Sequence, residues 1–299
     1  MKQFRYIMVF AVLMISGTLF AQQEPTFTMY KYNMNIFNPG YVGASGYTEL
    51  NMNIRSQWSN VDGAPQTQSL SFIRPMNDKV ALGISILNDK VDVIKETDVA
   101  VDFSYRVMLD ENADLYLGVK GGFYSFKADL TEKGIQGDPL FDQNISRING
   151  IFGAGAYLKM QRFYATLSVP NFLGGQRVED DDLGTGNYTE ARDKLHVYTG
   201  AGYSFDLSEN LKLEPSVLAR IVQGAPASFD LNAMAVINDK FEFGGSYRID
   251  DSFSAIAMLQ LTDWMELGYA YEFTTSEINN YSNGSHEFML RFNLSGSSE

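Results

Sequence analysis

The sequence has no cysteine and only two histidines. Disulfides, cysteine-ligated metal sites and thiol nucleophiles are therefore excluded, and a histidine-based metal centre has few ligands available. Basic residues are also scarce, with 23 Lys and Arg against 36 Asp and Glu. Because binding to a phosphate backbone needs clustered cations, this balance argues against a nucleic-acid partner. Beyond residue 21 no apolar run approaches the roughly 18 residues that indicate a transmembrane helix.

Aromatic residues and glycine are abundant instead, with 21 Phe, 17 Tyr, 2 Trp and 26 Gly. Aromatic side chains favour β-strands. Apolar residues make up 45% of the chain, which is enough for an ordered fold. The composition therefore predicts an ordered, predominantly β protein.

The first 21 residues have the pattern of a secretory signal peptide. Lys2 and Arg5 form a basic start, residues 6–20 are mostly apolar, and Ala21 supplies a small residue at the cleavage point. The apolar run is shorter than the roughly 20 residues that a membrane-spanning helix needs. We therefore expect residues 1–21 to be removed and the mature protein to be exported.

Apolar and polar side chains alternate along most of the remaining chain. In residues 98–107, for example, Val99, Val101 and Phe103 alternate with charged or small neighbours. Successive side chains of a strand point to opposite faces, so each such segment predicts a strand with one apolar and one wet face. Fourteen segments have this pattern: 47–57, 67–75, 79–87, 97–108, 114–125, 150–160, 162–170, 193–206, 211–222, 226–237, 240–249, 252–261, 264–274 and 284–294.

The lengths and connections of these segments favour a membrane barrel over a soluble β-sandwich. Most are about 9 to 12 residues long, as a tilted bilayer-crossing strand requires. Connections after even-numbered segments are short, whereas several after odd-numbered ones are long: 59–66, 88–96, 127–149, 171–192 and 275–283. Aromatic residues near segment ends suit the girdles of such barrels: Trp58, Tyr124, Phe163, Tyr198, Phe205, Trp264 and Phe273. We expect an all-β transmembrane outer-membrane β-barrel of about 14 antiparallel strands over residues 46–294, followed by a C-terminal tail, 295–299.

Ten short phrases occur in a fixed order along the mature chain. They are residues 25–28 (PTFT), 38–41 (NPGY), 55–58 (RSQW), 62–65 (DGAP), 87–89 (LND), 168–171 (SVPN), 224–226 (GAP), 230–232 (DLN), 284–287 (GSHE) and 289–291 (MLR). As an ordered set they resemble the PorP/SprF family of outer-membrane proteins of the type IX secretion system. The resemblance covers nearly all of the mature chain.

The resemblance implies a function in protein secretion at the bacterial outer membrane. Such a barrel helps export and retain cargo, such as the large surface adhesins of gliding motility, by recognising the C-terminal domain of the cargo. Its implied partners are the cargo, other type IX secretion components and outer-membrane lipids, with no cofactor and no enzymatic activity. The alternative function is an outer-membrane diffusion channel or a hydrophobic-solute transporter.

Two regions are candidates for contact with a partner. The loop after the first segment carries an aromatic anchor, an acidic group and a turn, in Trp58, Asp62, Gly63, Ala64 and Pro65. Residues 22–45 precede the first segment and are too aromatic for a free tail. Because a barrel of this size encloses space, this segment is either a plug in the lumen or a periplasmic docking segment.

Charged residues on the wet faces predict a polar lumen wall, used either for cargo or ions or for pairing between strands. His196 lies on a wet face and His286 on an apolar face, so a shared catalytic dyad is not expected. The acidic run 179–182 lacks the spacing of an EF-hand. We therefore predict no catalytic and no metal site. The wet-face set comprises Asp98, Asp102, Arg106, Lys120, Lys159, Lys212, Glu214, Arg220, Asp230, Glu242, Arg248, Glu266, Glu272, Glu287 and Arg291.

Overall fold

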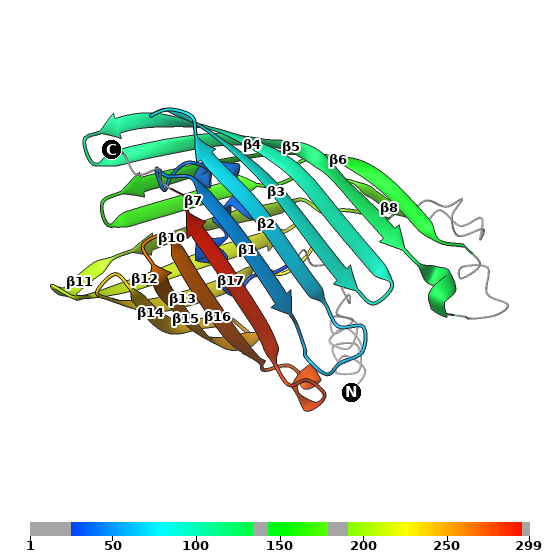
Figure 1. Cartoon of the computed structure of the whole chain (residues 1–299). Coiled ribbons are helices and arrows are strands. Elements are labelled where there is room, and N and C mark those ends of the chain that lie inside the picture. The colour runs from blue at the N-terminus through cyan, green and yellow to red at the C-terminus, as the bar shows by residue number, and fades with distance from the viewer. Residues whose placement is uncertain (1–24, 134–142, 179–190, 295–299) are drawn as a thin grey trace, which may run out of the picture.

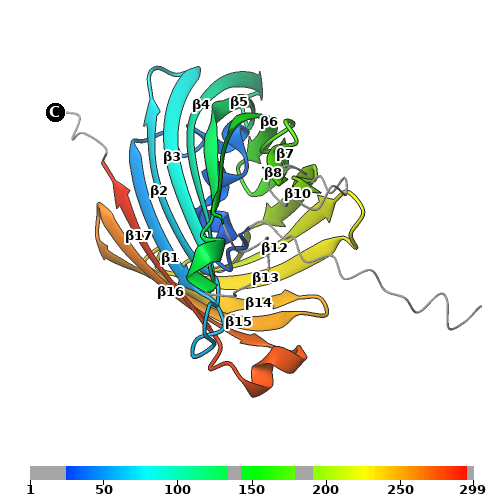
Figure 2. The same cartoon turned by 90° about the vertical axis from the view of Figure 1, so that its right-hand side faces the viewer.

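The computed structural model describes residues 25–133, 143–178 and 191–294. The expected signal peptide, the acidic run 179–182 and the C-terminal tail lie outside these residues. Fourteen antiparallel strands form a closed ring (Figures 1 and 2). The ring closes where β1 pairs with β17 and where β10 pairs with β12. The predicted barrel and its strand number are therefore confirmed.

The ring strands follow the predicted segments closely. They are β1 (Glu49–Ser56), β2 (Gln66–Pro75), β3 (Val80–Val91), β4 (Ile94–Asp110), β5 (Ala113–Ala128), β6 (Ile145–Met160), β7 (Phe163–Val169), β10 (His196–Tyr203), β12 (Leu211–Val222), β13 (Ser228–Ile237), β14 (Phe241–Arg248), β15 (Ser252–Thr262), β16 (Met265–Thr274) and β17 (Ser285–Asn293). Outside the ring, β8 (Gln176–Val178) pairs with β9 (Ala191–Arg192). Short 3-10 turns are η1 (Tyr30–Tyr32), η2 (Met34–Ile36), η3 (Pro39–Tyr41), η4 (Leu130–Lys133) and η6 (Glu277–Asn280).

The alternation in the sequence corresponds to the two faces of the wall. In β4, Val101 is 54% exposed on the outside, whereas its neighbour Asp102 is fully buried on the inside. A lipid-facing barrel needs this arrangement, with apolar side chains outside and polar ones inside. No helix within the described residues is long and apolar enough to cross a membrane.

Connections of different length gather at opposite ends of the barrel. The end that carries the β2–β3, β4–β5 and β6–β7 turns is called the short-turn end, and the other the long-loop end. One expected long loop, 88–96, is absent, because β3 and β4 continue until Val91 pairs with Ile94. Only Asp92 and Val93 connect these strands, and Asp92 takes the left-handed backbone conformation of a tight turn. The alternation of apolar and polar residues in the sequence covers only residues 79–87 and 97–108, because both faces of the extended parts of β3 and β4 are polar.

The eighth predicted segment is divided into two strands. β10 ends at Tyr203, and β11 (Phe205–Ser208) continues the pairing with β12. On β12, the residues that pair with β10 end at Ser216, and those that pair with β11 start at Leu213. Pro215 lies between these two stretches. Proline has no N–H to donate to a neighbouring strand. The missing donor therefore coincides with the interruption.

Residues 25–45 lie inside the ring (Figure 2). They run from the long-loop end, where Thr28 contacts Glu287 near the start of β17, to the short-turn end, where Gly43 lies beside Ala81 near the start of β3. Their aromatic and methionine side chains are buried against the inner wall in two clusters. Tyr30 and Phe37 pack with residues of β5, β6, β10 and β12, whereas Met29 and Tyr32 pack with residues of β13, β15, β16 and β17. The interior of the barrel is therefore occupied over much of its length.

Candidate functional site

Two wall glycines make room for the turn η3 inside the barrel. A Cβ atom on Gly118 would lie 2.2 Å from the carbonyl carbon of Pro39, and one on Gly155 would lie 2.0 Å from Asn38 Oδ1. The Asn38 side chain accepts a hydrogen bond from Gly40 N at 2.8 Å and donates to Ala156 O at 3.0 Å. The segment 38–41 therefore fits the wall through shape and through paired backbone groups.

A buried ionic cluster attaches the start of this segment to the wall. Arg55, whose side chain is fully buried, forms ion pairs with Glu272 at 2.6 Å and Glu287 at 3.2 Å. Glu287 also accepts hydrogen bonds from the backbone N–H groups of Thr28 (2.8 Å) and Met29 (3.2 Å). The carboxylate of Glu287 thereby joins β1, β17 and the N-terminal segment.

Further along the segment, Lys31 forms an ion pair with Glu214, and Tyr32 donates a hydrogen bond to Glu242. Both carboxylates belong to the wet-face set predicted from the sequence. Much of that set forms pairs of opposite charge, such as Lys120 with Asp102 and Arg248 with Asp230. The expectation of a polar wall that pairs across strands is therefore met at these positions.

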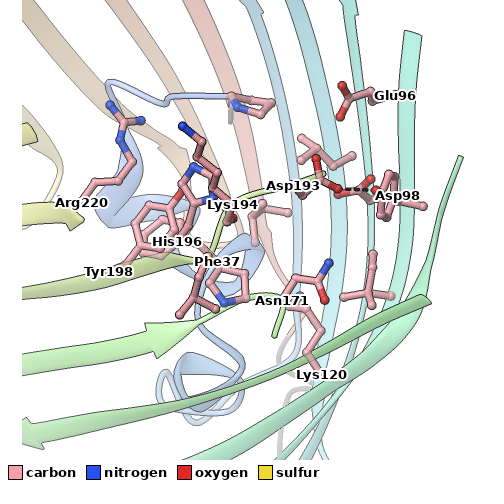
Figure 3. A pocket seen from close by; sticks show the side chains of 18 of the residues that line it. Phe37, Glu96, Asp98, Lys120, Asn171, Asp193, Lys194, His196, Tyr198 and Arg220 are labelled. Atoms are coloured by element: carbon pink, nitrogen blue, oxygen red, sulfur yellow. Dashed lines mark hydrogen bonds between the residues drawn. The ribbon is translucent and has the colours of Figure 1, made fainter. Parts of the chain in front are cut away.

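A cavity of about 380 Å³ opens at the long-loop end, and we call it the vestibule (Figure 3). Phe27, Tyr30 and Phe37 of the N-terminal segment form its base, on the side toward the short-turn end. Residues of β3 to β6, β10, β12 and β13 form its wall. A second cavity of about 190 Å³ lies at the short-turn end, beside Lys31 and Tyr164. Residues of the N-terminal segment lie between the two.

One side of the vestibule is acidic and internally paired. Arg177 of β8 forms ion pairs with Glu96 and with Asp193, and Tyr124 donates a hydrogen bond to Asp193. Burial alone lowers the pKa of the Arg177 guanidinium, but the charges of Glu96 and Asp193 outweigh it, so the pKa is raised. Arg177 therefore stays charged and holds β8 against the barrel wall.

The opposite side is mainly basic and carries Lys194, His196 and Arg220, next to Tyr198 (Figure 3). The carboxylate of Asp230 on β13 also lies on this side, where it is paired with Arg248 at 2.6 Å. Arg220 on β12 lies directly opposite Tyr198 on β10, whose ring stacks on Phe37 at 4.9 Å between centroids. The guanidinium of Arg220 donates one long hydrogen bond, 3.4 Å, to Ser228 Oγ. Among the described residues, no carboxylate forms an ion pair with it.

The sequence pattern predicts only part of this site. The inward orientation of Arg220 and His196 is confirmed, and His286 lies outside, where its Nδ1 is 2.8 Å from Tyr269 Oη. The expectation that Tyr124 and Tyr198 belong to the lipid-facing girdle is wrong, since both are buried on the lumen side. Each lies at a position that alternates with the apolar residues of its strand. The alternation therefore indicates that both side chains face the lumen.

The candidate loop lies apart from the vestibule. Trp58 is half-buried, Asp62 and Gly63 are exposed, and Ala64 and Pro65 are intermediate. None of these residues lines the vestibule. Backbone hydrogen bonds fix the loop, from Ser59 N to Gly284 O at 2.8 Å and from Asp92 N to Gly63 O at 2.9 Å. The loop is therefore a structured part of the long-loop end, and its partner-binding role stays a prediction.

The vestibule is lined by aromatic, acidic and basic side chains. Within residues 25–133, 143–178 and 191–294, no group of three or more His, Cys, Asp or Glu side chains is placed to hold a metal ion. Aromatic rings at the base, an acidic wall and a basic wall suit a polypeptide with charged groups.

Residues 19–292 match the family described as type IX secretion system membrane protein PorP/SprF. A comparison with curated proteins finds no relative. Among solved structures, the toluene transporter TbuX of Ralstonia pickettii is similar with a TM-score of 0.50 and 10% identity, over 85% of this chain and 91% of that chain. A FadL homologue of Pseudomonas aeruginosa has a TM-score of 0.48 and 10% identity, over 91% of this chain and 95% of that chain. At 10% identity, the likeness to TbuX shows a similar fold and nothing more.

Proposed function

This chain belongs to the PorP/SprF family of type IX secretion system membrane proteins, and from that premise we propose that it retains exported proteins at the cell surface. In this proposal it lies in the outer membrane after removal of residues 1–21. It recognises the C-terminal domain of its cargo, a large surface protein such as a gliding adhesin, and it works with other secretion components. It carries out no catalysis.

The observation that supports this proposal best is the vestibule. It lies at the long-loop end, which faces the cell exterior in barrels with short periplasmic turns. Its base is formed by the N-terminal segment, so it offers a recess with polar walls rather than an open pore. We also propose the neighbouring loop, with Trp58, Asp62, Gly63, Ala64 and Pro65, as a second partner-contacting surface, because it lies at the same end of the barrel.

The alternative function is a diffusion channel or a hydrophobic-solute transporter. That function needs a path through the barrel. Residues 25–45 fill the interior with buried aromatic and methionine side chains and are attached by Arg55, Glu272 and Glu287. In the proposal this segment is a plug, and this role favours cargo retention over transport of small molecules.

Deletion of the gene in its native host tests the proposal. Surface proteins are released from intact cells by protease and identified by mass spectrometry, with and without the gene, and after complementation. We expect one or a few large proteins to disappear from the surface and to return on complementation. Unchanged surface proteins, together with ion conductance of the purified barrel in a planar bilayer, would support the channel instead.

A further inference from the structure

We propose that the vestibule binds the free C-terminal carboxylate of a polypeptide, with Arg220 as the group that receives it. This inference rests on the proposed function, because it states which part of the cargo enters the barrel. Arg220 lines the vestibule and is 8% exposed. It therefore faces the cavity while most of its guanidinium is removed from bulk water.

Arg220 differs from the other buried arginines of the described chain in having no counter-charge. Arg55 is paired with Glu272 and Glu287, and Arg248 with Asp230 and Asp251. A buried charge without a partner is costly, because it has lost hydration and gained no ion pair. A carboxylate that enters the vestibule supplies the missing partner. The planar guanidinium suits it, since it can donate two parallel hydrogen bonds to one carboxylate.

The shape of the vestibule favours a chain end over a loop. Its volume of about 380 Å³ lies at the small end of ligand sites, and Phe27, Tyr30 and Phe37 limit its depth. One extended chain can insert its last few residues, whereas a loop must bring two chain segments into the same space. The stacked rings of Phe37 and Tyr198 lie beside Arg220 and offer apolar surface for the terminal side chain.

The charge distribution favours a single carboxylate over a polyanion such as a lipid phosphate group. Lys194 lies on the same side as Arg220, whereas Glu96, Asp98 and Asp193 lie on the opposite side (Figure 3). Asp230, on the strand next to Arg220, also lines the vestibule, but its charge is paired with Arg248 at 2.6 Å. A polyanion would meet these acidic groups at close range, which is unfavourable. One carboxylate can turn toward Arg220 and away from them.

Two peptide libraries test the inference on the full-length barrel in detergent. Both are dye-labelled hexapeptides of randomised sequence; one has free C-terminal carboxylates and the other C-terminal amides. Fluorescence anisotropy measures their binding. Because a charge-assisted bidentate contact is involved, we expect the free-acid library to bind about 10- to 100-fold more tightly. Arg220→Gln should abolish this preference and Arg220→Lys should keep part of it. Arg162→Gln, at an exposed arginine of the short-turn end, should leave it unchanged.

Equal binding of the two libraries by the wild-type barrel would overturn the inference without any need for a variant. A free-acid preference that persists in a folded Arg220→Gln protein would also overturn it, because the carboxylate would then bind elsewhere. These outcomes are separate from the proposed function, which fails only if surface proteins are unaffected by deletion. Normal loss of surface proteins on deletion with equal library binding would reject the carboxylate site alone.

Discussion

Replacement of Arg55 by methionine should loosen the N-terminal segment and destabilise the whole barrel. The substitution keeps an apolar side chain of similar length but leaves Glu272 and Glu287 buried without their main cation. Arg248 remains 3.7 Å from Glu272, so only part of that charge is compensated. Removal of one partner from a buried ion pair costs about 3–5 kcal/mol. We expect a loss of free energy of unfolding in this range.

Guanidinium denaturation in detergent micelles measures this loss through the fluorescence of Trp58 and Trp264, the only two tryptophans. Arg106→Met is the matched control, because the Arg106–Asp114 pair is 32% and 20% exposed and such pairs contribute about 0–1 kcal/mol. Addition of Glu287→Gln to the Arg55 variant should recover part of the stability by removing one orphaned charge. Equal destabilisation by Arg55→Met and Arg106→Met would refute the reasoning.

Three further predictions concern the same segment. Gly118→Ala should lower the free energy of unfolding by about 1–3 kcal/mol through overpacking against Pro39. Gly121→Ala, with open space around its Cβ position, should change it little. Equal thermal stability of the two variants would contradict this prediction. Val42→Cys with Gly83→Cys should form a disulfide in a chain otherwise free of cysteine, because a Cβ on Gly83 would lie 3.2 Å from a Val42 methyl. A non-reducing gel detects this disulfide, and its absence would favour a periplasmic docking segment. An epitope inserted directly after the expected signal peptide should be accessible to antibody on intact cells, since the segment enters the barrel from the long-loop end; labelling only after lysis would contradict this.

The wall of the barrel is predictable from the sequence because alternation is a local property of each strand. Val101 and Asp102 face opposite sides whatever their neighbours are, so strand positions and faces follow from the pattern. Alternation no longer marks a strand where both of its faces are polar, as in the extensions of β3 and β4 beyond the apolar belt. Residue type alone does not place Tyr124 and Tyr198 on the lumen side, because an aromatic side chain is compatible with either side of a barrel wall.

The site is less predictable because it depends on contacts between distant segments. The inward orientation of Arg220 follows from parity, but its lack of a counter-charge depends on the register of β10, β12 and β13. The pairing of Arg55 with Glu272 and Glu287 joins residues more than 200 positions apart. The fit of Pro39 against Gly118 likewise has no local signal, since a glycine in a strand has several possible uses.

The most direct test of cargo retention is purification of the tagged chain from its native outer membrane at native expression. Mild detergent extraction, chemical crosslinking and mass spectrometry identify what is bound and through which region. We predict a large exported protein whose crosslinks to the barrel lie in its C-terminal domain and reach residues around the vestibule. A barrel recovered without any exported protein, from cells whose surface proteins are unchanged when the gene is deleted, would contradict the central claim.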